Sequence, residues 1–177
     1  LLAPRTPDAP PELLSTGSAL LNLAASGRVE GGIAKAQYCL IVGDSSSGKS
    51  FLARTILAEA SVNPAFDDYL LIHDDAENGC WFDNDRFFGP KLTARLQPPR
   101  GTREDPQFSS TVESFYDVLD DLTAAKRPFV YVLDSENALS SVKDEEQYQK
   151  EKDAREKTKE AGGDYGTAKA KVHSNCL

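Results

Sequence analysis

The sequence contains no methionine, and its three cysteines (Cys39, Cys80 and Cys176) form no C-x-x-C pair. We therefore expect reduced thiols in a cytoplasmic protein, with neither a disulfide framework nor a zinc site. His73 and His173 are too isolated in the sequence to suggest a metal-binding pair. Because a full-length product would begin with methionine, we expect a fragment or a processed form.

Long apolar runs and excess positive charge are also missing. No stretch approaches the roughly 18 apolar residues of a membrane-spanning helix, and the N-terminus lacks the pattern of a secretory signal. Acidic residues outnumber basic ones by 28 to 20, which gives a formal net charge of −8 and argues against a strongly basic nucleic-acid-binding surface. The 177 residues, 40% of them hydrophobic, are enough for one domain with a core.

One motif stands out, the Walker A pattern G-x-x-x-x-G-K-[ST], which binds the phosphates of a nucleotide. It reads Gly43-Asp44-Ser45-Ser46-Ser47-Gly48-Lys49-Ser50, followed by Phe51. The two glycines let the backbone turn and approach the phosphates, which the loop amides and the next helix cradle. Lys49 is expected to meet the β and γ phosphates, and the Ser50 hydroxyl to ligate Mg²⁺. The alternative is a Gly/Ser-rich loop that matches by chance.

The flanking residues supply the context that this motif requires. The apolar run 38–42 predicts a strand before the loop, and residues 51–60 predict a helix after it that stops at Asn63 and Pro64. A second apolar run, 69–73, predicts a strand buried on both faces. A third strand, 128–135, runs into Asp134, the Walker B pattern whose carboxylate holds Mg²⁺ through water.

The remaining segments are less specific. Residues 1–13 are proline-rich and read as an extended segment, residues 14–142 as the ATPase core, and residues 143–177 as a charged arm. Within the core, residues 14–25 predict a capped helix, residues 80–96 an irregular helix, and residues 110–126 a helix opened by a capping box at Ser110 and Glu113. The arm is expected to be a solvated helix or a partly disordered segment over residues 143–164.

Three stretches together resemble the core of RecA-type recombinases, in particular their divergent bacteriophage versions. They are Leu14-Ser15-Thr16-Gly17-Ser18, Asp75-Ala76-Glu77 and Val132-Leu133-Asp134-Ser135, in this order around the Walker A motif. The resemblance spans residues 14–177. It implies a RecA-like α/β fold, with a mostly parallel sheet, flanking helices and a P-loop.

The resemblance also implies roles for single residues. Glu77 matches the catalytic glutamate that activates the attacking water, with Asp74 or Asp75 as alternatives, and Asp134 matches the magnesium-binding aspartate. A first DNA-binding loop would fall at Gly162, Gly163 and Tyr165, with Lys169 and Lys171 at its end. Together these imply a DNA-dependent ATP hydrolase of recombination or repair that uses ATP and Mg²⁺. It would bind single-stranded DNA as a helical filament or ring of identical subunits.

The sequence departs from this family at its C-terminal end, because the chain stops before the nucleotide-sensing glutamine and the second DNA-binding loop. Other interpretations of single residues also remain. Glu77 can be an acid at the start of a helix, stabilised by the helix dipole. Three aromatic residues can either belong to the core or stack on adenine, namely Trp81, Phe87 and Phe88. Lys169 and Lys171 can be solvated charges. For the whole chain, the alternatives are a helicase-like or clock-type ATPase, or an ATP-binding assembly module with negligible turnover.

Overall fold

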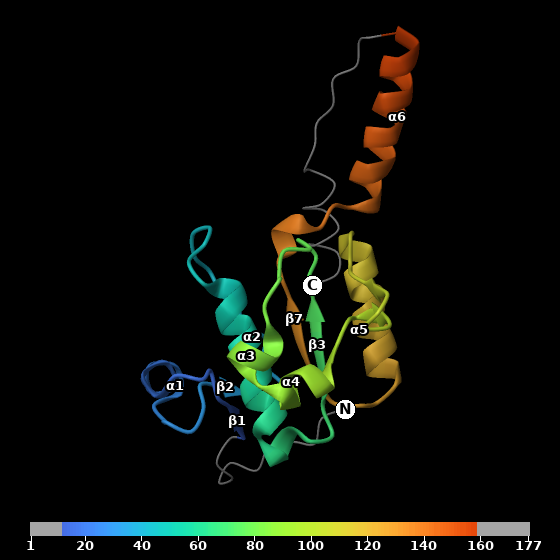
Figure 1. Cartoon of the computed structure of the whole chain (residues 1–177). Helices are drawn as coiled ribbons and strands as arrows, with labels where there is room; N and C mark the ends of the chain where they lie inside the picture. The colour runs from blue at the N-terminus through green and yellow to red at the C-terminus, as the bar shows by residue number, and fades with distance from the viewer. Residues whose placement is uncertain (1–11, 159–177) are drawn as a thin grey trace. The chain divides into compact units, whose positions relative to one another are not determined.

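The computed structural model describes residues 12–158, with side chains to residue 152. Over these residues the chain is mixed α/β, and its largest sheet is parallel, as expected from the buried apolar runs. It divides into two compact units, which we describe in turn (Figure 1). The first contains Leu1–Asp67 and Asp83–Arg95, and the second contains Asp68–Phe82 and Leu96–Leu177.

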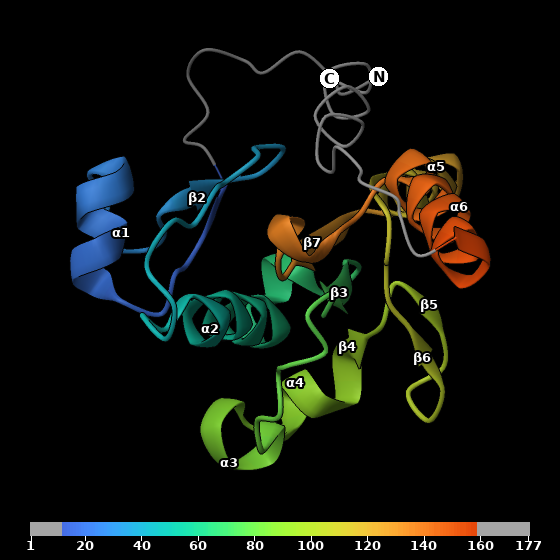
Figure 2. The same cartoon turned by 90° about the horizontal axis from the view of Figure 1, so that it is seen from above.

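The first unit opens with a two-stranded antiparallel sheet and a short helix (Figure 2). Strand β1 (Leu13–Leu14) pairs with β2 (Ile33–Ala34), and helix α1 (Ala19–Ser26) lies in the connection. The Ser18 side chain accepts the Leu21 N–H, and Gly27 ends the helix at a φ of 75°. This confirms the predicted capped helix, since both ends are fixed by local chemistry.

Helix α2 (Lys49–Val62) follows the phosphate loop and forms most of the core of this unit. Leu57 and Ala60 are fully buried, and helix α4 (Pro90–Arg95) contributes buried Leu92. Helix α3 (Asn84–Phe88) and α4 replace the single irregular helix predicted for this region. As predicted, α2 stops at Asn63, whose side chain caps the 3₁₀ turn η1 (Pro64–Phe66).

Arg95 secures the end of α2. Its guanidinium donates to the carbonyls of Ala60 (3.3 Å), Ser61 (3.0 Å), Phe66 (2.5 Å) and Asp67 (3.2 Å). The last carbonyls of a helix have no intrahelical partner, and a cation stabilises this end of the helix dipole. One side chain therefore ties α4 to both α2 and η1.

The strand predicted for residues 38–42 is wrong. No secondary structure forms there, and Tyr38 and Val42 are 83% and 82% exposed. A strand needs a hydrogen-bonding partner, and within the described residues this segment pairs with none. Without a partner or burial, nothing offsets the entropy of ordering the backbone.

The second unit is built on a three-stranded sheet in the order β4-β3-β7. Strand β3 (Leu70–Asp74) lies in the middle and pairs in parallel with β4 (Leu96–Gln97) and with β7 (Phe129–Leu133). Four of the five β3 residues are buried, which confirms the strand that the second apolar run predicts. Strand β7 confirms the third predicted strand.

Helix α5 (Val112–Ala124) packs beside this sheet, with the Phe115 ring 5.7 Å from the ring of Tyr131 on β7 (Figure 1). Its capping box lies one residue later than predicted, and uses Thr111 and Ser114 in place of Ser110 and Glu113. A small hairpin, β5 (Arg100–Gly101) and β6 (Pro106–Gln107), precedes the helix.

After β7 come the 3₁₀ turn η2 (Glu136–Ala138) and helix α6 (Val142–Thr158). The charged arm is thus helical as far as the structure describes it. Among the described residues, no helix combines the length and the apolar character needed to cross a membrane. The predicted DNA-binding residues Gly162, Gly163, Tyr165, Lys169 and Lys171 lie outside the described residues.

We predict that Arg95→Ala lowers the free energy of unfolding by about 2–3 kcal/mol, because it leaves several carbonyls at the end of α2 without a charged donor. Urea denaturation measures the change. Arg28→Ala is the control, since the Arg28 side chain forms an exposed ion pair with Glu30 and its loss should cost under about 0.5 kcal/mol. Equal effects of the two substitutions would refute the capping role.

Candidate functional site

The phosphate loop contains one position at which the backbone conformation favours glycine. Gly48 has a φ of 91°, which strains any residue with a Cβ atom. A Cβ atom added to Gly43 would lie 2.7 Å from the Ser47 hydroxyl oxygen. A turn in which the Ser47 N–H donates to the Asp44 carbonyl (3.2 Å) closes the loop. The backbone conformation therefore favours glycine at position 48, whereas a side chain at position 43 would require the Ser47 hydroxyl to rotate away.

Lys49 is the first residue of α2, and its ammonium folds back over the loop. Nζ donates to the carbonyls of Gly43 (3.0 Å) and Asp44 (2.8 Å). The cap residue, Gly48, offers no side-chain acceptor to the first helical amides. The loop thus places one cation and the positive end of a 14-residue helix at the same point, which is the electrostatic requirement for holding an anion.

The next two residues of the predicted site lie in the first turn of α2. Ser50 is half-buried, and the Phe51 ring lies 5.0 Å from that of Phe88 and 6.1 Å from that of Phe87. Phe51 and Phe87 keep 43% and 54% of their surface exposed. The interpretation of Phe87 as a core residue is therefore wrong, whereas Phe88 is half-buried. Trp81, in the second unit, is 86% exposed.

In the second unit, the predicted acidic residues gather where β3 and β7 end. The parallel register pairs His73 with Val132 and Asp74 with Leu133, and the Asp134 N–H donates to the Asp74 carbonyl (2.9 Å). Both strands therefore deliver their following residues to the same edge of the sheet. This is the edge at which open parallel sheets place their ligands.

Two of these acids are already engaged in holding the fold. Asp74 is fully buried, and its carboxylate accepts the Ser109 N–H (2.8 Å) and the Tyr131 hydroxyl (2.5 Å). The Asp75 carboxylate accepts the N–H groups of Gly79 (3.1 Å) and Cys80 (2.9 Å). Both carboxylates therefore stabilise the fold through their hydrogen bonds. Because they already accept two donors each, either one is a poor candidate for a catalytic base.

Glu77 differs from them because its side chain is exposed. Its Oε1 accepts the Ser135 hydroxyl at 2.6 Å, and its N–H donates to the Asp134 carbonyl at 3.2 Å. Glu77 and Asp134 are thus brought together within the second unit. An exposed carboxylate oriented by one hydroxyl can still accept a proton from water.

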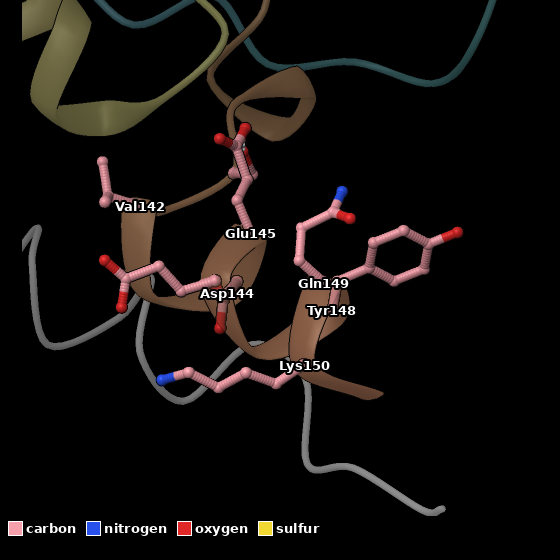
Figure 3. A pocket seen from close by; sticks show the side chains of 8 residues that line it. Val142, Asp144, Glu145, Tyr148, Gln149 and Lys150 are labelled. Atoms are coloured by element: carbon pink, nitrogen blue, oxygen red, sulfur yellow. Dashed lines mark hydrogen bonds between the residues drawn. The ribbon is translucent and has the colours of Figure 1, made fainter. Parts of the chain in front are cut away.

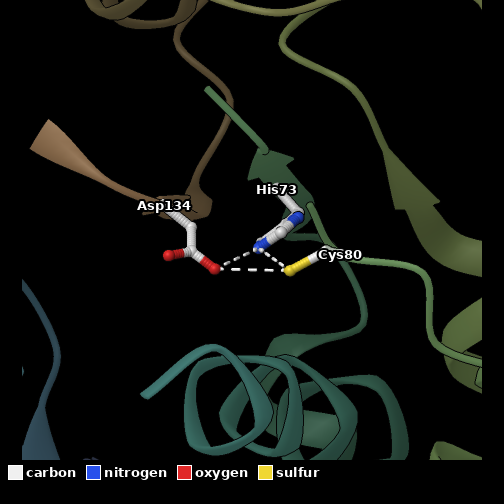
Figure 4. Close-up of side chains that lie close together, drawn as sticks. All are labelled: His73, Cys80 and Asp134. Carbon is white, nitrogen blue, oxygen red and sulfur yellow. Dashed lines mark hydrogen bonds and ion pairs between the residues drawn. The ribbon is translucent and has the colours of Figure 1, made fainter. Parts of the chain in front are cut away.

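The structure also assembles a cluster that the sequence did not predict (Figure 4). Asp134 Oδ2 lies 3.3 Å from Cys80 Sγ and 3.7 Å from His73 Nε2, and the Sγ–Nε2 distance is 4.0 Å. The sequence indicates no metal pair for His73, because the other histidine, His173, is 100 positions away. The parallel register of β3 and β7 brings Asp134 next to His73. This register cannot be predicted from the spacing of residues along the sequence.

One open hollow on the second unit lies along the first turns of α6 (Figure 3). None of the predicted site residues lines it. Its lining side chains come from Ser140, Val142, Asp144, Glu145, Glu146, Tyr148, Gln149 and Lys150. Three carboxylates beside one lysine disfavour a phosphate ligand, so this hollow is no candidate for the nucleotide.

Comparisons with protein-family models, with curated proteins and with solved structures found no match. The function must therefore be argued from the site residues themselves.

We predict that Tyr131→Phe lowers the free energy of unfolding by about 1–3 kcal/mol at neutral pH, because the buried Asp74 carboxylate loses a donor. Burial, then the hydrogen bond and charge of Asp74, raises the pKa of Tyr131 well above its ordinary value of about 10. The folded state thus holds the phenol proton more tightly than the unfolded state does. The protonated phenol of Tyr131 therefore contributes fully to the free energy of unfolding below about pH 10. This contribution is lost as the pH rises further.

The measurement is urea denaturation of both proteins between pH 7 and about pH 11, where the stability difference should shrink as the pH rises above about 10. Tyr148→Phe is the matched control, because Tyr148 is half-exposed on α6 and should change stability little. A difference that stays constant through the alkaline range would contradict the raised pKa.

Proposed function

We propose that this protein binds ATP with Mg²⁺ and hydrolyses it, and that the loop 43–50 is its phosphate site. The observation that carries the proposal is the position of Lys49. Its ammonium bridges the carbonyls of Gly43 and Asp44 at the start of a long helix with no side-chain cap. A bound triphosphate would offer that cation far stronger acceptors than two neutral carbonyls.

Each part of the loop then has a chemical task. The amides at the start of α2 and the Lys49 ammonium neutralise the β and γ phosphates, whose charge shifts during transfer. The Ser50 hydroxyl ligates Mg²⁺, which prefers oxygen ligands and retains several waters. Phe51 lies one residue further along the helix, and its partly exposed ring offers an apolar surface beside the loop.

Hydrolysis also needs a base for water and a carboxylate for Mg²⁺, and the RecA-type resemblance implies Glu77 and Asp134 for these two roles. We assign Glu77 as the base that polarises the attacking water, because the carboxylates of Asp74 and Asp75 already accept two donors each. We assign Asp134 to Mg²⁺ through an intervening water. The shared position of both residues, after neighbouring parallel strands, supports the assignment.

On the basis of the resemblance to RecA-type recombinases, we also propose that the protein is an ATPase of DNA recombination or repair. It would work as a homo-oligomer on single-stranded DNA. That part rests on the three sequence stretches and on the parallel β3–β7 pair, which a RecA-like sheet requires. The test is phosphate release from ATP and Mg²⁺ with and without single-stranded DNA. Stimulation by DNA supports recombination, and equal rates would leave a general P-loop ATPase.

We predict that Lys49→Ala abolishes ATP hydrolysis, because the transferred phosphoryl group loses its principal protein cation. Phosphate release should fall by at least about 100-fold, comparable to the loss of a strong electrostatic contact in a transition state. Lys91→Ala, which removes an exposed lysine from α4, is the control and should retain full activity. Undiminished turnover in Lys49→Ala would overturn the phosphate site.

We predict that Glu77→Gln retains ATP binding and loses turnover, because the amide keeps the side-chain size but cannot accept the proton from water. Nucleotide affinity and phosphate release are measured on the same samples. Glu104→Gln is the matched control, since Glu104 lies exposed in the loop between β5 and β6. Normal turnover in Glu77→Gln would show that the base is another residue.

A further inference from the structure

The side chains of His73, Cys80 and Asp134 converge on one point at the end of the β3–β7 pair (Figure 4). His73 pairs in register with Val132, and residues two apart on a strand point to the same face. Asp134 therefore extends the face of Val132 and meets the His73 imidazole. Backbone pairing alone fixes the position of two of the three groups.

Cys80 is brought to this point by the loop that follows β3. The Asp75 carboxylate, itself buried, accepts the N–H groups of Gly79 and Cys80, and the Asn78 N–H donates to the Asp75 carbonyl (2.8 Å). Asn78 sits at a φ of 51°, a conformation that asparagine adopts more readily than most residues. The loop thus turns back on itself and holds the Cys80 thiol at the edge of the sheet.

The distances between the three groups are close to those around a single four-coordinate ion. With usual zinc bond lengths and tetrahedral angles, nitrogen, sulfur and oxygen ligands lie about 3.4–3.6 Å from one another. The observed separations are 3.3 Å (S–O), 3.7 Å (N–O) and 4.0 Å (S–N). An ion bound by all three groups would draw Cys80 Sγ and His73 Nε2, the most distant pair, closer together.

The chemical type of the ligand atoms determines which metal ions the site would bind. A thiolate and an imidazole are ligands for Zn²⁺ and related transition metals, whereas Mg²⁺ takes oxygen ligands. His73 is 3% exposed and Asp134 9% exposed, so the ion would have little water to displace on their side. Cys80 is half-buried, which leaves one side of the cluster open.

We propose that His73 Nε2, Cys80 Sγ and Asp134 Oδ2 form a site for one divalent transition-metal ion of the Zn²⁺ class. Three protein ligands leave the fourth position to water or to an external ligand, as in zinc sites that interact with small molecules. Binding releases the thiol proton, because the thiolate is the ligand. The site goes beyond the proposed ATPase, although it shares Asp134 with it, and its tests need no nucleotide.

The first test uses Co²⁺, whose absorption reports both sulfur ligation and coordination geometry, in a Cys39→Ser/Cys176→Ser protein. Cys80 is then the only cysteine of the chain. We expect saturation at one Co²⁺ per chain, a sulfur-to-cobalt charge-transfer band, strong visible bands of four-coordinate cobalt, and displacement by Zn²⁺. Further replacement by Cys80→Ser should remove the charge-transfer band. Saturation without that band would overturn the proposal.

The second test avoids any change at the cluster. In the same single-cysteine protein, Zn²⁺ should slow the reaction of Cys80 with a thiol reagent at least about tenfold, because the metal-bound sulfur is no longer free to attack. Mg²⁺ should have no effect. The control is a protein that keeps only Cys39, which is exposed, and its reaction rate should not respond to Zn²⁺. No protection of Cys80, or equal protection by Mg²⁺, would overturn the proposal.

His73→Asn is the variant that tests the nitrogen ligand, because it keeps a polar side chain of similar size in the strand. We expect Zn²⁺ affinity to fall at least about tenfold, measured by competition with a chelating dye. His173→Asn is the matched control, since it replaces the only other histidine of the chain. Equal zinc affinity in both variants would remove His73 from the site and overturn the three-ligand assignment.

Discussion

The parallel pairing of β3 with β7 is the constraint on which the second unit depends. Five residue pairs set the register, from Leu70 with Phe129 to Asp74 with Leu133. Because both strands run in the same direction, the residues that follow them, Glu77 and Asp134 among them, emerge at one edge. A one-residue shift would turn every side chain of β7 to the other face and separate Asp134 from His73. The acidic edge and the His73–Cys80–Asp134 cluster therefore share one structural cause.

That edge carries the buried aspartates Asp74 and Asp75, and their carboxylates are hydrogen-bonded in different ways. Asp74 uses a backbone amide and the Tyr131 hydroxyl, and Asp75 uses two amides of its own loop. Buried carboxylates cost free energy unless they are hydrogen-bonded, so these contacts are required for the sheet edge to exist. Glu77 differs from both because its side chain is exposed, and it is the acid to which we assign the proposed role of base.

Local features were predictable from the sequence. The Ser18 cap, the end of α2 at Asn63 and the β3 and β7 strands follow from short-range chemistry and from continuous apolar runs. Features that depend on distant residues were not predictable. An apolar run such as 38–42 indicates that burial of the segment would be favourable. It does not indicate whether another strand is available to pair with it. The Cys80–Asp134 contact joins residues 54 positions apart and depends entirely on register.

The nucleotide-binding role depends on the loop 43–50, which we propose holds the β and γ phosphates. Its most direct test is displacement of a fluorescent ATP analogue from the intact chain, in the presence of Mg²⁺, by ATP, ADP, AMP and adenosine. Because Lys49 and the helix amides act on the distal phosphates, we expect ATP and ADP to displace the analogue at far lower concentrations than AMP or adenosine. AMP that competes as well as ATP, or an analogue that does not bind, would contradict the account.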